Sequence, residues 1–523
     1  MSPEPQTVLH VVPHTHWDRE WYEPFEGYRL RLVRVLDRLL DVLESPGAAH
    51  FHFDGQTAAI EDYVAVRPEA APRIRALVAA GRLAVGPWRI LMDEFLCSPE
   101  TIVRNLRQGA ATARVLGADP RLGYIPDSFG HIAQMPQILA LAGMTDACVW
   151  RGVPFAVDRP AFWWTAPDGT RIRTMYLATS YSNAASLPET FEDLIVRAKR
   201  IVTDMAAFRP EGVVLAMNGT DHQGLQEHLS ALFTEANSRQ DEVVFRLGSM
   251  AEYVAAAPHE GLPAWSGEMR SSARANLLMG VCSARMPLKR AEFEASAELE
   301  RYAEPLAALS GFDPGTMLDE AWRAMVENSA HDSVCGCGID AVADAVLDRY
   351  RRARRVAELV AAESLGRLAE RVTRNGDGVL VFNPSPFERG GVAEATVPFP
   401  QGAALAGDDG APRAVQVLGS TEQVVVDMTL RGSELARIVP TIHSRMMGAL
   451  YVNRMELVPG RTRTLRLELG PIPVGRFDVE AAKRDVEAAA STAPRARFHV
   501  IGVGPPLVRL LLDAPPVGGL GWR

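Results

Sequence analysis

The sequence predicts an α/β domain with a parallel sheet, then a helical region, and then an antiparallel β domain. Up to about residue 250, apolar strand-like segments alternate with helical patterns, and a repeated strand–helix order produces a parallel sheet that is either open or closed into a barrel. Residues 286–373 are helical in pattern, with little strand between the helices. From about residue 376, short β-rich segments are separated by Gly, Pro and Asp, which is typical of an antiparallel β domain.

The first strand–helix units are clearly marked. The segment VLHVVP precedes a helix, and the helix after GRLAVGP is expected to begin with Ser98 as its N-cap and Pro99 as its first residue. The first of these helices carries an apolar stripe at helical spacing, formed by Tyr28, Leu32, Leu36, Leu39 and Leu43. Such a stripe predicts a helix that buries one face.

The same alternation continues through the α/β region. RLGYIP precedes QMPQILALAGM, GVVLAMNG precedes LQEHLSALFTEANS, and EVVFRLG precedes SMAEYVAAA. Between them, FWWTAPDGTRIRTMYL predicts a hairpin that turns at Pro167, Asp168 and Gly169. We therefore expect three domains: an α/β domain at 1–260, a helical bundle at 261–375 and a β-sandwich-like domain at 376–523.

The composition is that of an ordinary globular protein, with 47% hydrophobic and 23% charged residues. The net charge is only −9 over 523 residues, and no basic stripe argues for nucleic acid as a partner. We find neither an apolar run of roughly 18 residues, as a membrane span needs, nor the pattern of a signal peptide, so we expect a cytoplasmic protein that does not contact membranes. The odd number and uneven spacing of the cysteines do not fit a disulfide framework. They are Cys97, Cys148, Cys282, Cys335 and Cys337.

Polar clusters directly follow several of the predicted strands. VLHVVP leads into HTHWD, RLGYIP into PDSFGH and VVLAMNG into GTDH, and Asp54 and Arg151 follow two further strands. Ligands bind at the carboxyl ends of the strands in α/β sheets and barrels. Three clusters that each combine a carboxylate with a histidine, at three strand ends, therefore predict a shared pocket.

His16 and Asp18 are candidates for a metal site. Residues i and i+2 of an extended chain point to the same side, and imidazole and carboxylate are common ligands of zinc. Two residues cannot hold a metal alone, so we expect the others to come from Asp127 and from the segment AHDS at His331. The alternative is a strand end whose side chains are simply hydrogen-bonded to one another. Cys335-x-Cys337 is interpreted as structural, because a single CxC pair is weak evidence for a metal site.

Four segments, in order, resemble the motifs of a known family: VVPHTHWDREWY, YIPDSFGHIAQMPQIL, NGTDHQ and NSAHDSVCGCGID. They resemble the family-38 glycoside hydrolases, the zinc-dependent retaining α-mannosidases, and the bacterial branch in particular. The later segment VLVFNPSPFERGG resembles the β domain that follows in the family. The resemblance implies a seven-stranded α/β barrel, a three-helix bundle and then β domains. Family members are usually much longer, so we expect the β domain at 376–523 to be truncated relative to the family.

The resemblance also implies a role for each matching residue. One zinc, or another divalent ion, would be held by His16, Asp18, Asp127 and His331. Asp127 would also be the nucleophile, and Asp221 the general acid/base; a retaining glycosidase needs two such carboxyl groups roughly 5–5.5 Å apart. The positions that match residues near the bound sugar are Trp21, Phe129, Arg151 and Asp332.

We therefore expect metal-dependent, retaining hydrolysis of terminal α-mannosyl residues through a glycosyl-enzyme on Asp127. The substrate would be a mannoside or a mannose-containing oligosaccharide. Two alternatives remain. A zinc hydrolase resembling polysaccharide deacetylases would use zinc-bound water and would not need Asp221, and a non-catalytic carbohydrate-binding relic would need neither carboxylate. The linkage, the aglycone and the oligomeric state are open. Because the family's further β domain is missing, we expect apolar surface after residue 376 that favours a homo-oligomer.

Overall fold

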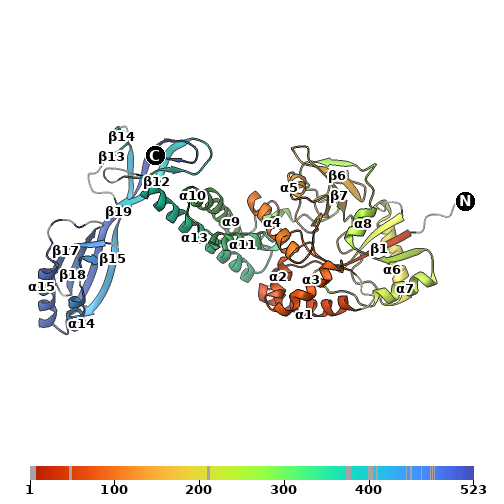
Figure 1. Ribbon diagram of the computed structural model, residues 1–523, viewed down its shortest axis with the longest axis horizontal. Helices are drawn as coiled ribbons and strands as arrows, with labels where there is room; N and C mark the ends of the chain where they lie inside the picture. Colours follow the sequence, from red (N-terminus) through yellow and green to blue (C-terminus); the bar gives the residue numbers. More distant parts are fainter. Residues whose placement is uncertain are drawn as a thin grey trace. The chain divides into compact units, whose positions relative to one another are not determined.

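The computed structural model describes residues 7–45, 50–208, 212–372, 378–398, 404–407, 410–442, 444–447, 450–460, 462–470, 473, 475 and 477–523. The chain forms two compact units, Met1–Thr373 and Arg374–Arg523, which Figure 1 shows in sequence colours. The predicted boundary at residue 376 lies outside the described residues. Each unit is described by itself.

The first unit contains two five-stranded sheets. In one sheet β1 is central, because it pairs in parallel with β2, β8 and β9, and β3 follows β2. In the other the order is β10-β6-β7-β5-β4. The strands are β1 (Thr7–Thr15), β2 (Phe51–Phe53), β3 (Leu83–Ala84), β4 (Leu122–Ile125), β5 (Asp146–Val149), β6 (Ala161–Thr165), β7 (Arg171–Tyr176), β8 (Val213–Asn218), β9 (Val243–Leu247) and β10 (Ala264–Ser266).

The predicted parallel sheet is confirmed, but the seven-stranded barrel is not. All pairs of the β1 sheet are parallel, as are β4–β5 and β5–β7. Within the described part of the first unit, no strand of one sheet pairs with a strand of the other. The strands β2 and β3, at the edge of the β1 sheet, have only three and two residues.

Helices cover the sheets where the sequence periodicity predicts them. They are α1 (Phe25–Glu44), α2 (Ala58–Val64), α3 (Ala71–Ala79), α4 (Pro99–Val115), α5 (Met135–Leu141), α6 (Phe191–Asp204), α7 (Leu229–Arg239) and α8 (Met250–Ala256). The five residues of the predicted apolar stripe are all buried in α1. The side chain of Ser98 caps α4 by accepting a hydrogen bond from the N–H of Thr101 at 3.1 Å, and β6 and β7 form the predicted antiparallel hairpin.

A helical bundle completes the first unit (Figure 1), as predicted for this part of the chain. Helix α9 (Met286–Glu298) continues through a π-helical turn, Leu299–Ala303, into α10 (Glu304–Ser310), and packs with α11 (Met317–Asn328) and α13 (Asp340–Glu370). The short helix α12 (His331–Val334) lies between α11 and α13 in sequence. Buried side chains that include Leu288, Leu299, Trp322, Val346 and Tyr350 form the core of the bundle.

Buried ion pairs join the bundle to the α/β region. Arg89, whose side chain is 5% exposed, pairs with Glu61 of α2 and with Glu327 of α11. Arg349 of α13 pairs with Glu20, which follows β1, and Ser333 of α12 donates a hydrogen bond to the same Glu20. These contacts fix α12 against the ends of the strands, and α12 carries one of the predicted metal ligands.

The second unit is built on a six-stranded sheet with the order β12-β19-β18-β17-β16, and β15 also pairs with β19. Its pairs are antiparallel except β18–β19, so the predicted antiparallel β domain is confirmed with one parallel pair. The elements are β11 (Phe382–Asn383), β12 (Arg389–Pro398), β13 (Leu405–Ala406), β14 (Pro412–Arg413), β15 (Val415–Arg431), α14 (Gly432–Ile438), β16 (Met446–Met447), β17 (Leu450–Val458), β18 (Arg463–Gly470), α15 (Val479–Thr492), β19 (Arg497–Val517) and β20 (Gly521–Trp522).

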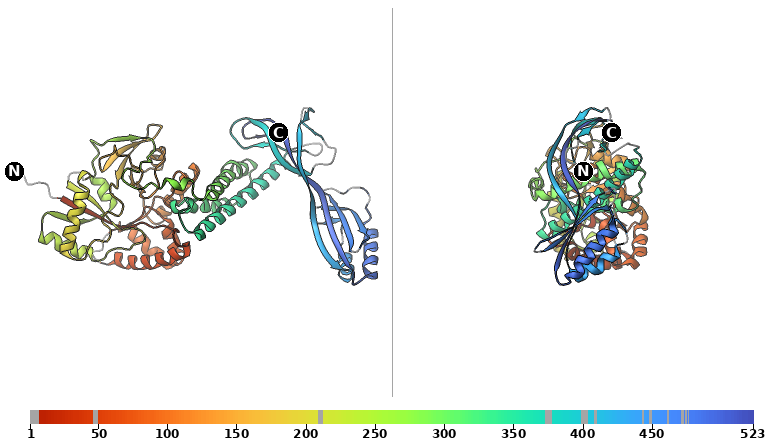
Figure 2. Two further views of the ribbon diagram at one scale, coloured as in Figure 1. Left: turned by 180° about the vertical axis from the view of Figure 1, so that it is seen from behind. Right: turned by 90° about the vertical axis from the view of Figure 1, so that its left-hand side faces the viewer.

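Helices α14 and α15 of the second unit, both blue in Figure 2, pack against each other at one end of the long strands.

Strand β15 exposes apolar side chains, among them Val417, Val424 and Met428, and such surface favours association. Self-association itself stays a prediction. None of the helices in the described residues is long and apolar enough to span a membrane.

Candidate active site and metal centre

The predicted site residues lie at the carboxyl ends of the strands of the first unit. His16 directly follows β1, Asp127 follows β4, Arg151 follows β5 and Asp221 follows β8. Backbone hydrogen bonds clamp the end of β1: the N–H of His16 donates to the carbonyl of Thr220 at 3.3 Å. The sequence folds this way because β1 and β8 run in parallel register up to Pro13 and Asn218, so the residues beyond them arrive at the same edge.

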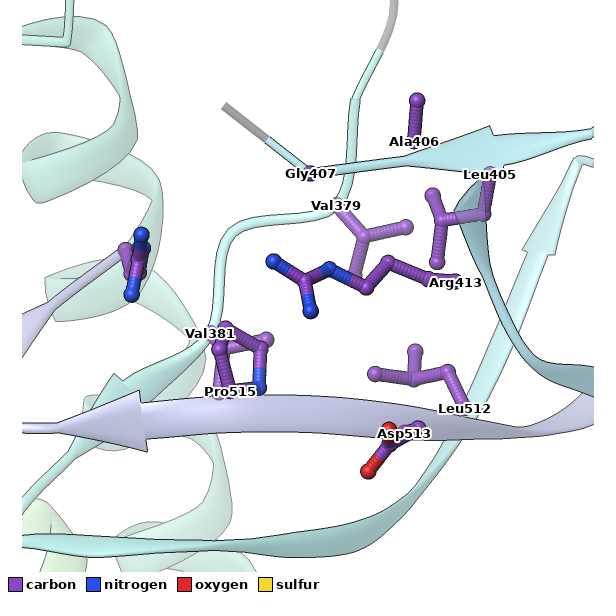
Figure 3. Close-up of a pocket in the computed structure, with 10 residues that line it drawn as sticks. Val379, Val381, Leu405, Ala406, Gly407, Arg413, Leu512, Asp513 and Pro515 are labelled. Atoms are coloured by element: carbon purple, nitrogen blue, oxygen red, sulfur yellow. The ribbon is translucent and has the colours of Figure 1, made fainter. Parts of the chain in front are cut away.

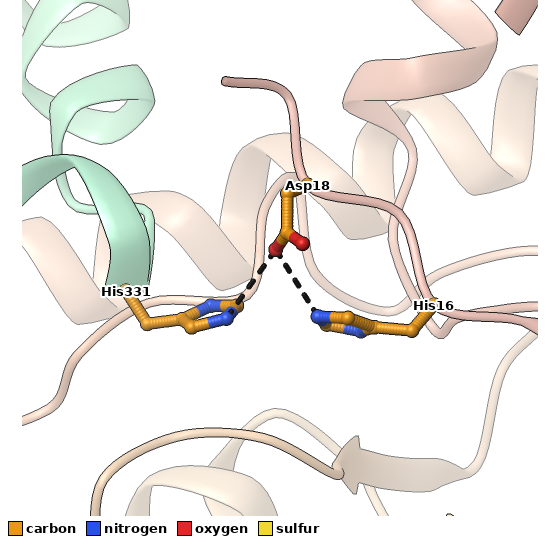
Figure 4. A group of neighbouring side chains, drawn as sticks. All are labelled: His16, Asp18 and His331. Atoms are coloured by element: carbon orange, nitrogen blue, oxygen red, sulfur yellow. Dashed lines mark ion pairs between the residues drawn. The ribbon is translucent and has the colours of Figure 1, made fainter. Parts of the chain in front are cut away.

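His16, Asp18 and His331 form a tight cluster (Figure 4). Nε2 of His16 lies 3.1 Å from Oδ1 of Asp18, and Nε2 of His331 lies 3.4 Å from the same oxygen. Oδ2 of Asp127 lies 3.7 Å from Nε2 of His16 and 3.5 Å from Nε2 of His331. The structure thus groups three of the four predicted ligands, His16, Asp18 and His331, and places Asp127 beside the two histidines.

The other ring nitrogen of each histidine is held from outside the cluster. Nδ1 of His16 lies 2.9 Å from Oδ2 of Asp54, and Nδ1 of His331 lies 3.1 Å from the carbonyl oxygen of Leu91. A carbonyl oxygen can only accept, so Nδ1 of His331 carries a proton and donates it to Leu91. The same orientation places Nε2 of His16 toward Asp18 and Asp127. This arrangement leaves both Nε2 atoms facing the centre of the cluster, as in metal-binding histidines.

The donor set fits a zinc ion. The Nε2 atoms of His16 and His331 are buried and close to carboxylate oxygens, and neither they nor Nδ1 of His16 makes a hydrogen bond of good geometry. A buried polar atom without a hydrogen bond is costly, and a bound cation would satisfy both Nε2 atoms. Ligands about 2.0–2.1 Å from a tetrahedral zinc lie about 3.3 Å apart, and the four nitrogen–oxygen distances of the cluster are 3.1–3.7 Å.

The electrostatics of the cluster favour a cation. Burial lowers the pKa of His331, but the negative charges of Asp332, Asp127 and Asp18 outweigh it and raise that pKa to about 10. Burial likewise opposes the charged form of His16, yet Asp54 and Asp18 hold its pKa well above the usual value. Such shifts mean that the carboxylates create a strongly negative potential where the two rings meet. A divalent cation at that position would balance the same charges and leave the histidines neutral, as ligation requires.

Asp221 lies beside this cluster. Its backbone forms a parallel bridge with His16, and the hydroxyl of Tyr181 donates to Oδ1 of Asp221 at 2.8 Å. Burial raises the pKa of Tyr181, and the negative charges of Asp127 and Asp221 raise it further. The phenol of Tyr181 is therefore hydrogen-bonded to the residue that the sequence predicts as the acid/base.

Three of the four residues predicted to contact the sugar touch Asp127 or His331, and the fourth, Trp21, contacts the loop after α12. Arg151 donates through Nε to Oδ1 of Asp127, and the buried ring of Phe129 meets the ring of His331 edge-on at 5.5 Å. Oδ2 of Asp332 lies 3.8 Å from Nε2 of His331. Trp21 is half-buried, and its carbonyl accepts a hydrogen bond from the N–H of Ile339 in the loop after α12. Three of these residues thus contact the cluster directly, and Trp21 contacts it through that loop.

Comparison with known proteins identifies the family. Residues 6–268 match the profile of the "Glycosyl hydrolases family 38 N-terminal domain", and residues 276–368 match the "Alpha mannosidase middle domain". The chain belongs to glycoside hydrolase family 38. The family predicted from the four motifs is confirmed.

Relatives of this family-38 chain include enzymes from bacteria and animals. A "Putative mannosylglycerate hydrolase" of Halalkalibacterium halodurans is 33% identical over 70% of this chain and 43% of its own length. Human "Alpha-mannosidase 2C1" is 24% identical over 76% of this chain and 38% of its own. The crystal structure of an α-mannosidase from Enterococcus faecalis V583 superposes with a TM-score of 0.75 at 26% identity, over 99% of this chain and 56% of that chain. The chain thus spans less than half the length of these curated relatives.

Several residues of the family-38 site were not assigned a role from the sequence. Asp54 was noted only as a strand-end residue, yet it is fully buried and holds Nδ1 of His16. Tyr181 lies in an irregular segment after β7, where no periodic pattern draws attention to it. His14 shares the strand face of His16 but is not in the cluster, because its Nε2 donates to the carbonyl of Tyr181 at 2.7 Å. His222 holds Asp18 from the other side, since its Nε2 accepts from the N–H of Asp18 at 3.2 Å.

Other cavities lie away from these strand ends. A pocket of about 630 Å³ is lined by residues at the amino ends of the strands, including His52, Leu83, Leu122 and Asp146, where the family-38 cluster has no residue. In the second unit, a pocket beside Val381, Leu512 and other residues shown in Figure 3 holds only about 50 Å³. Sites for small molecules usually measure at least about 300 Å³, so this pocket is too small for a sugar.

Proposed function

We propose that the chain is an α-mannosidase that hydrolyses terminal α-mannosyl residues with retention, in a metal-dependent reaction. One observation carries the proposal. The carboxylate of Asp127 contacts His16, His331 and Arg151, while Asp221 lies beside His16 and accepts a hydrogen bond from the hydroxyl of Tyr181. Two carboxyl groups, one as nucleophile and one as acid/base, are what a retaining glycosidase requires.

In the proposed mechanism, Asp127 attacks the anomeric carbon as the glycosidic bond breaks, and Asp221 gives its proton to the leaving oxygen. Water then hydrolyses the glycosyl-enzyme, with Asp221 as the base that takes its proton. Arg151 helps to keep Asp127 ionised: burial raises the pKa of Asp127, whereas a hydrogen bond from His331 and the positive charges around it, that of Arg151 among them, bring it below the usual value. The hydroxyl of Tyr181 occupies Oδ1 of Asp221, which leaves Oδ2 to carry the proton.

Zinc, held by His16, Asp18, Asp127 and His331, would supply a Lewis acid that orients the hydroxyl groups of the sugar. Phe129 and Trp21 would stack on or border the sugar ring, and Arg151 and Asp332 would bind its hydroxyl groups. The substrates to be compared are α1,2-, α1,3- and α1,6-linked mannosides. Mannosylglycerate is added because the Halalkalibacterium relative is named after its hydrolysis.

The proposal is tested with an aryl α-mannoside, before and after removal of metal with a chelator and after return of zinc. Activity should be lost on chelation and restored by zinc, and a slow substrate should leave a mannosyl group on Asp127, which peptide mass spectrometry detects. Asp127→Ala should abolish both activity and labelling. Hydrolysis of an acetylated sugar without any labelled Asp127 would instead support a deacetylase, and binding without turnover would support a carbohydrate-binding protein.

The role of Asp221 is tested with leaving groups of different quality. An activated aryl leaving group needs little protonation, so Asp221→Ala should slow its release far less than that of a poor leaving group. General acid catalysis contributes about 10²–10⁴-fold, and we expect a difference of that order between the two substrates. Equal losses for both would show that another residue is the acid.

A further inference from the structure

A second group of potential metal ligands lies next to the proposed active site. Asp332, Cys335 and Cys337 each place a ligand atom within 4.8 Å of the others. All three belong to α12 and the loop that follows it, in the sequence HDSVCGCG. None of them is among the four ligands of the cluster around His16. Two thiols and a carboxylate form a softer donor set than that cluster, which contains only nitrogen and oxygen.

The loop is folded so that its two sulfur atoms turn to the same side. The N–H of Cys337 donates to Sγ of Cys335 at 3.3 Å, and Sγ of Cys337 lies 3.1 Å from Oδ1 of Asp332. Gly336, between the cysteines, has a φ of +78°, a conformation that glycine adopts without steric cost. The three ligand atoms therefore meet because of the backbone path, not because flexible side chains happen to approach.

The bundle holds this loop in place. Nζ of Lys289 on α9 donates to the carbonyl oxygens of Val334 and Cys335, at 3.0 and 2.5 Å. Arg285 donates to the carbonyl oxygens of Gly336 and Gly338, at 3.0 and 3.1 Å. Cys335 is fully buried, whereas Cys337 is exposed. The group is thus preorganised and still reachable from solvent through Cys337.

We infer that Asp332, Cys335 and Cys337 bind a thiophilic divalent cation, Zn²⁺ or Cd²⁺, at a site separate from the cluster of His16, Asp18, Asp127 and His331. Each thiol releases its proton to solvent as its sulfur binds the ion, and the carboxylate supplies the third ligand. Water completes the coordination. Metal binding leaves the oxidation state of both sulfur atoms unchanged, so it requires no oxidant.

The two sites would compete for Asp332. Its Oδ1 faces Cys337, and its Oδ2 lies 3.8 Å from Nε2 of His331. An ion on the thiols would draw Asp332 away from a bound sugar, so excess thiophilic metal should inhibit the enzyme. This consequence rests on the proposed function, whereas the binding of metal by the thiols does not.

The test uses the full chain, freed of metal and titrated with Cd²⁺ alone. Binding by thiolates gives an ultraviolet sulfur-to-cadmium charge-transfer band, which ligands with only nitrogen and oxygen do not give. We expect the wild-type band to saturate with one equivalent bound at the thiols, and Cd²⁺ to protect Cys337 from alkylation. Cys337→Ser and Cys335→Ser should each weaken this binding by at least about tenfold. The matched control is Cys282→Ser, which removes another exposed thiol and should leave the band unchanged.

Loss of the band in Cys282→Ser, or an unchanged band in Cys337→Ser, would overturn the inference. So would a disulfide between Cys335 and Cys337 in the purified protein. His16→Ala disables the other cluster, so a band that persists in this variant supports a separate site, and a band that disappears contradicts it. In the activity assay, inhibition by Cd²⁺ should need about tenfold more metal in Cys337→Ser than in the wild type. If the wild type hydrolyses no mannoside, the proposed function fails while the spectroscopic result still decides the metal site.

Discussion

Asp54 controls the orientation of His16 at the scale of single residues. It is fully buried, and its Oδ2 accepts hydrogen bonds from the N–H of Trp17 at 2.9 Å and from Nε2 of Gln56 at 2.8 Å. The same oxygen lies 2.9 Å from Nδ1 of His16. Three neighbours thus fix one carboxylate oxygen, and that oxygen in turn fixes the ring that faces the metal position.

Asp54→Asn is expected to weaken zinc binding by about 10–100-fold, the usual effect of changing the partner of a metal-binding histidine. The amide keeps the size of the side chain but loses the charge that holds the ring and raises its basicity. Competition with a chromophoric chelator measures the affinity. Asp168→Asn, in the exposed turn between β6 and β7, is the control and should bind zinc as the wild type does. Equal affinities in all three proteins would show that His16 does not depend on Asp54.

Tyr181→Phe should show how far the hydrogen bond from Tyr181 contributes to acid catalysis, because the variant keeps Asp221 but removes this bond. The variant keeps the ring that lies 5.2 Å from the ring of His16 but loses the hydroxyl that donates to Asp221. We expect kcat to fall by about tenfold with a poor leaving group, a small part of the 10²–10⁴-fold that acid catalysis can supply. With an activated aryl mannoside kcat should change little. A fall of equal size with both substrates would place Tyr181 in sugar binding instead.

At the scale of elements, a buried carboxylate connects helices α9 and α4. Glu292 on α9 is 9% exposed, and its Oε1 accepts a hydrogen bond from the N–H of Ser98, the cap of α4. Burial raises the pKa of Glu292 from 4.5 to about 7. The folded protein therefore binds this proton more tightly than the unfolded chain does. The stability that the group contributes is complete below about pH 4.5 and is lost as the pH rises through about 7.

Glu292→Gln should consequently raise the melting temperature at pH 8 and have little effect at pH 5. The amide resembles the protonated carboxyl and can still accept from Ser98. The gain at pH 8 is at most about 3 kcal/mol, from about 1.4 kcal/mol for each unit of pKa. Thermal unfolding at the two pH values measures it. Glu294→Gln, two residues further along α9, is the control, because a hydrogen bond from Arg290 lowers the pKa of Glu294 and its removal should give no gain at pH 8.

Long periodic elements could be predicted from the sequence, and short or irregular ones could not. The apolar stripe of α1, the cap of α4 and the β6–β7 hairpin follow from local rules, and the structure confirms them. The two-residue strand β3 and the π-helical turn at Leu299–Ala303 depend on packing that no local pattern records.

In the candidate site, residues at the ends of clear strands could be predicted, whereas residues that depend on tertiary contacts could not. Strand-end clusters predicted His16, Asp18 and Asp127, and His331 was the leading candidate for a further ligand. Tyr181 was missed because it comes from an irregular segment and meets Asp221 only through the tertiary fold. The role of Asp54 was missed because it depends on a contact with His16, which is 38 positions away in the sequence.

At the scale of the whole molecule, a metal in the cluster would add a further link between the bundle and the two sheets of the first unit. His331 lies on α12 beside the bundle, whereas His16 and Asp127 follow strands of the two different sheets. Because the ligands come from three segments, the free energy of metal binding adds to the free energy of unfolding of the whole unit.

Removal of metal should therefore lower the melting temperature of the first unit. At free zinc 1,000-fold above its Kd, the expected loss is about 4 kcal/mol. Differential scanning calorimetry with and without chelator measures the change. His331→Ala should melt at the same temperature under both conditions, because it can no longer form the link. A wild-type protein whose melting is insensitive to chelator would contradict the assignment of the ligands.

The central position of β1 also has a consequence for synthesis. The ribosome makes residues 7–15 well before the partners of β1 along residues 7–13, because β8 and β9 begin only at Val213 and Val243. At 5–20 residues per second, about 200 residues take roughly 10–40 s to translate. During that time the strand has an apolar sequence and an unpaired edge, the combination that leads nascent chains to aggregate. The newly made protein should therefore depend on chaperones that hold its amino-terminal strand until the middle of the chain arrives.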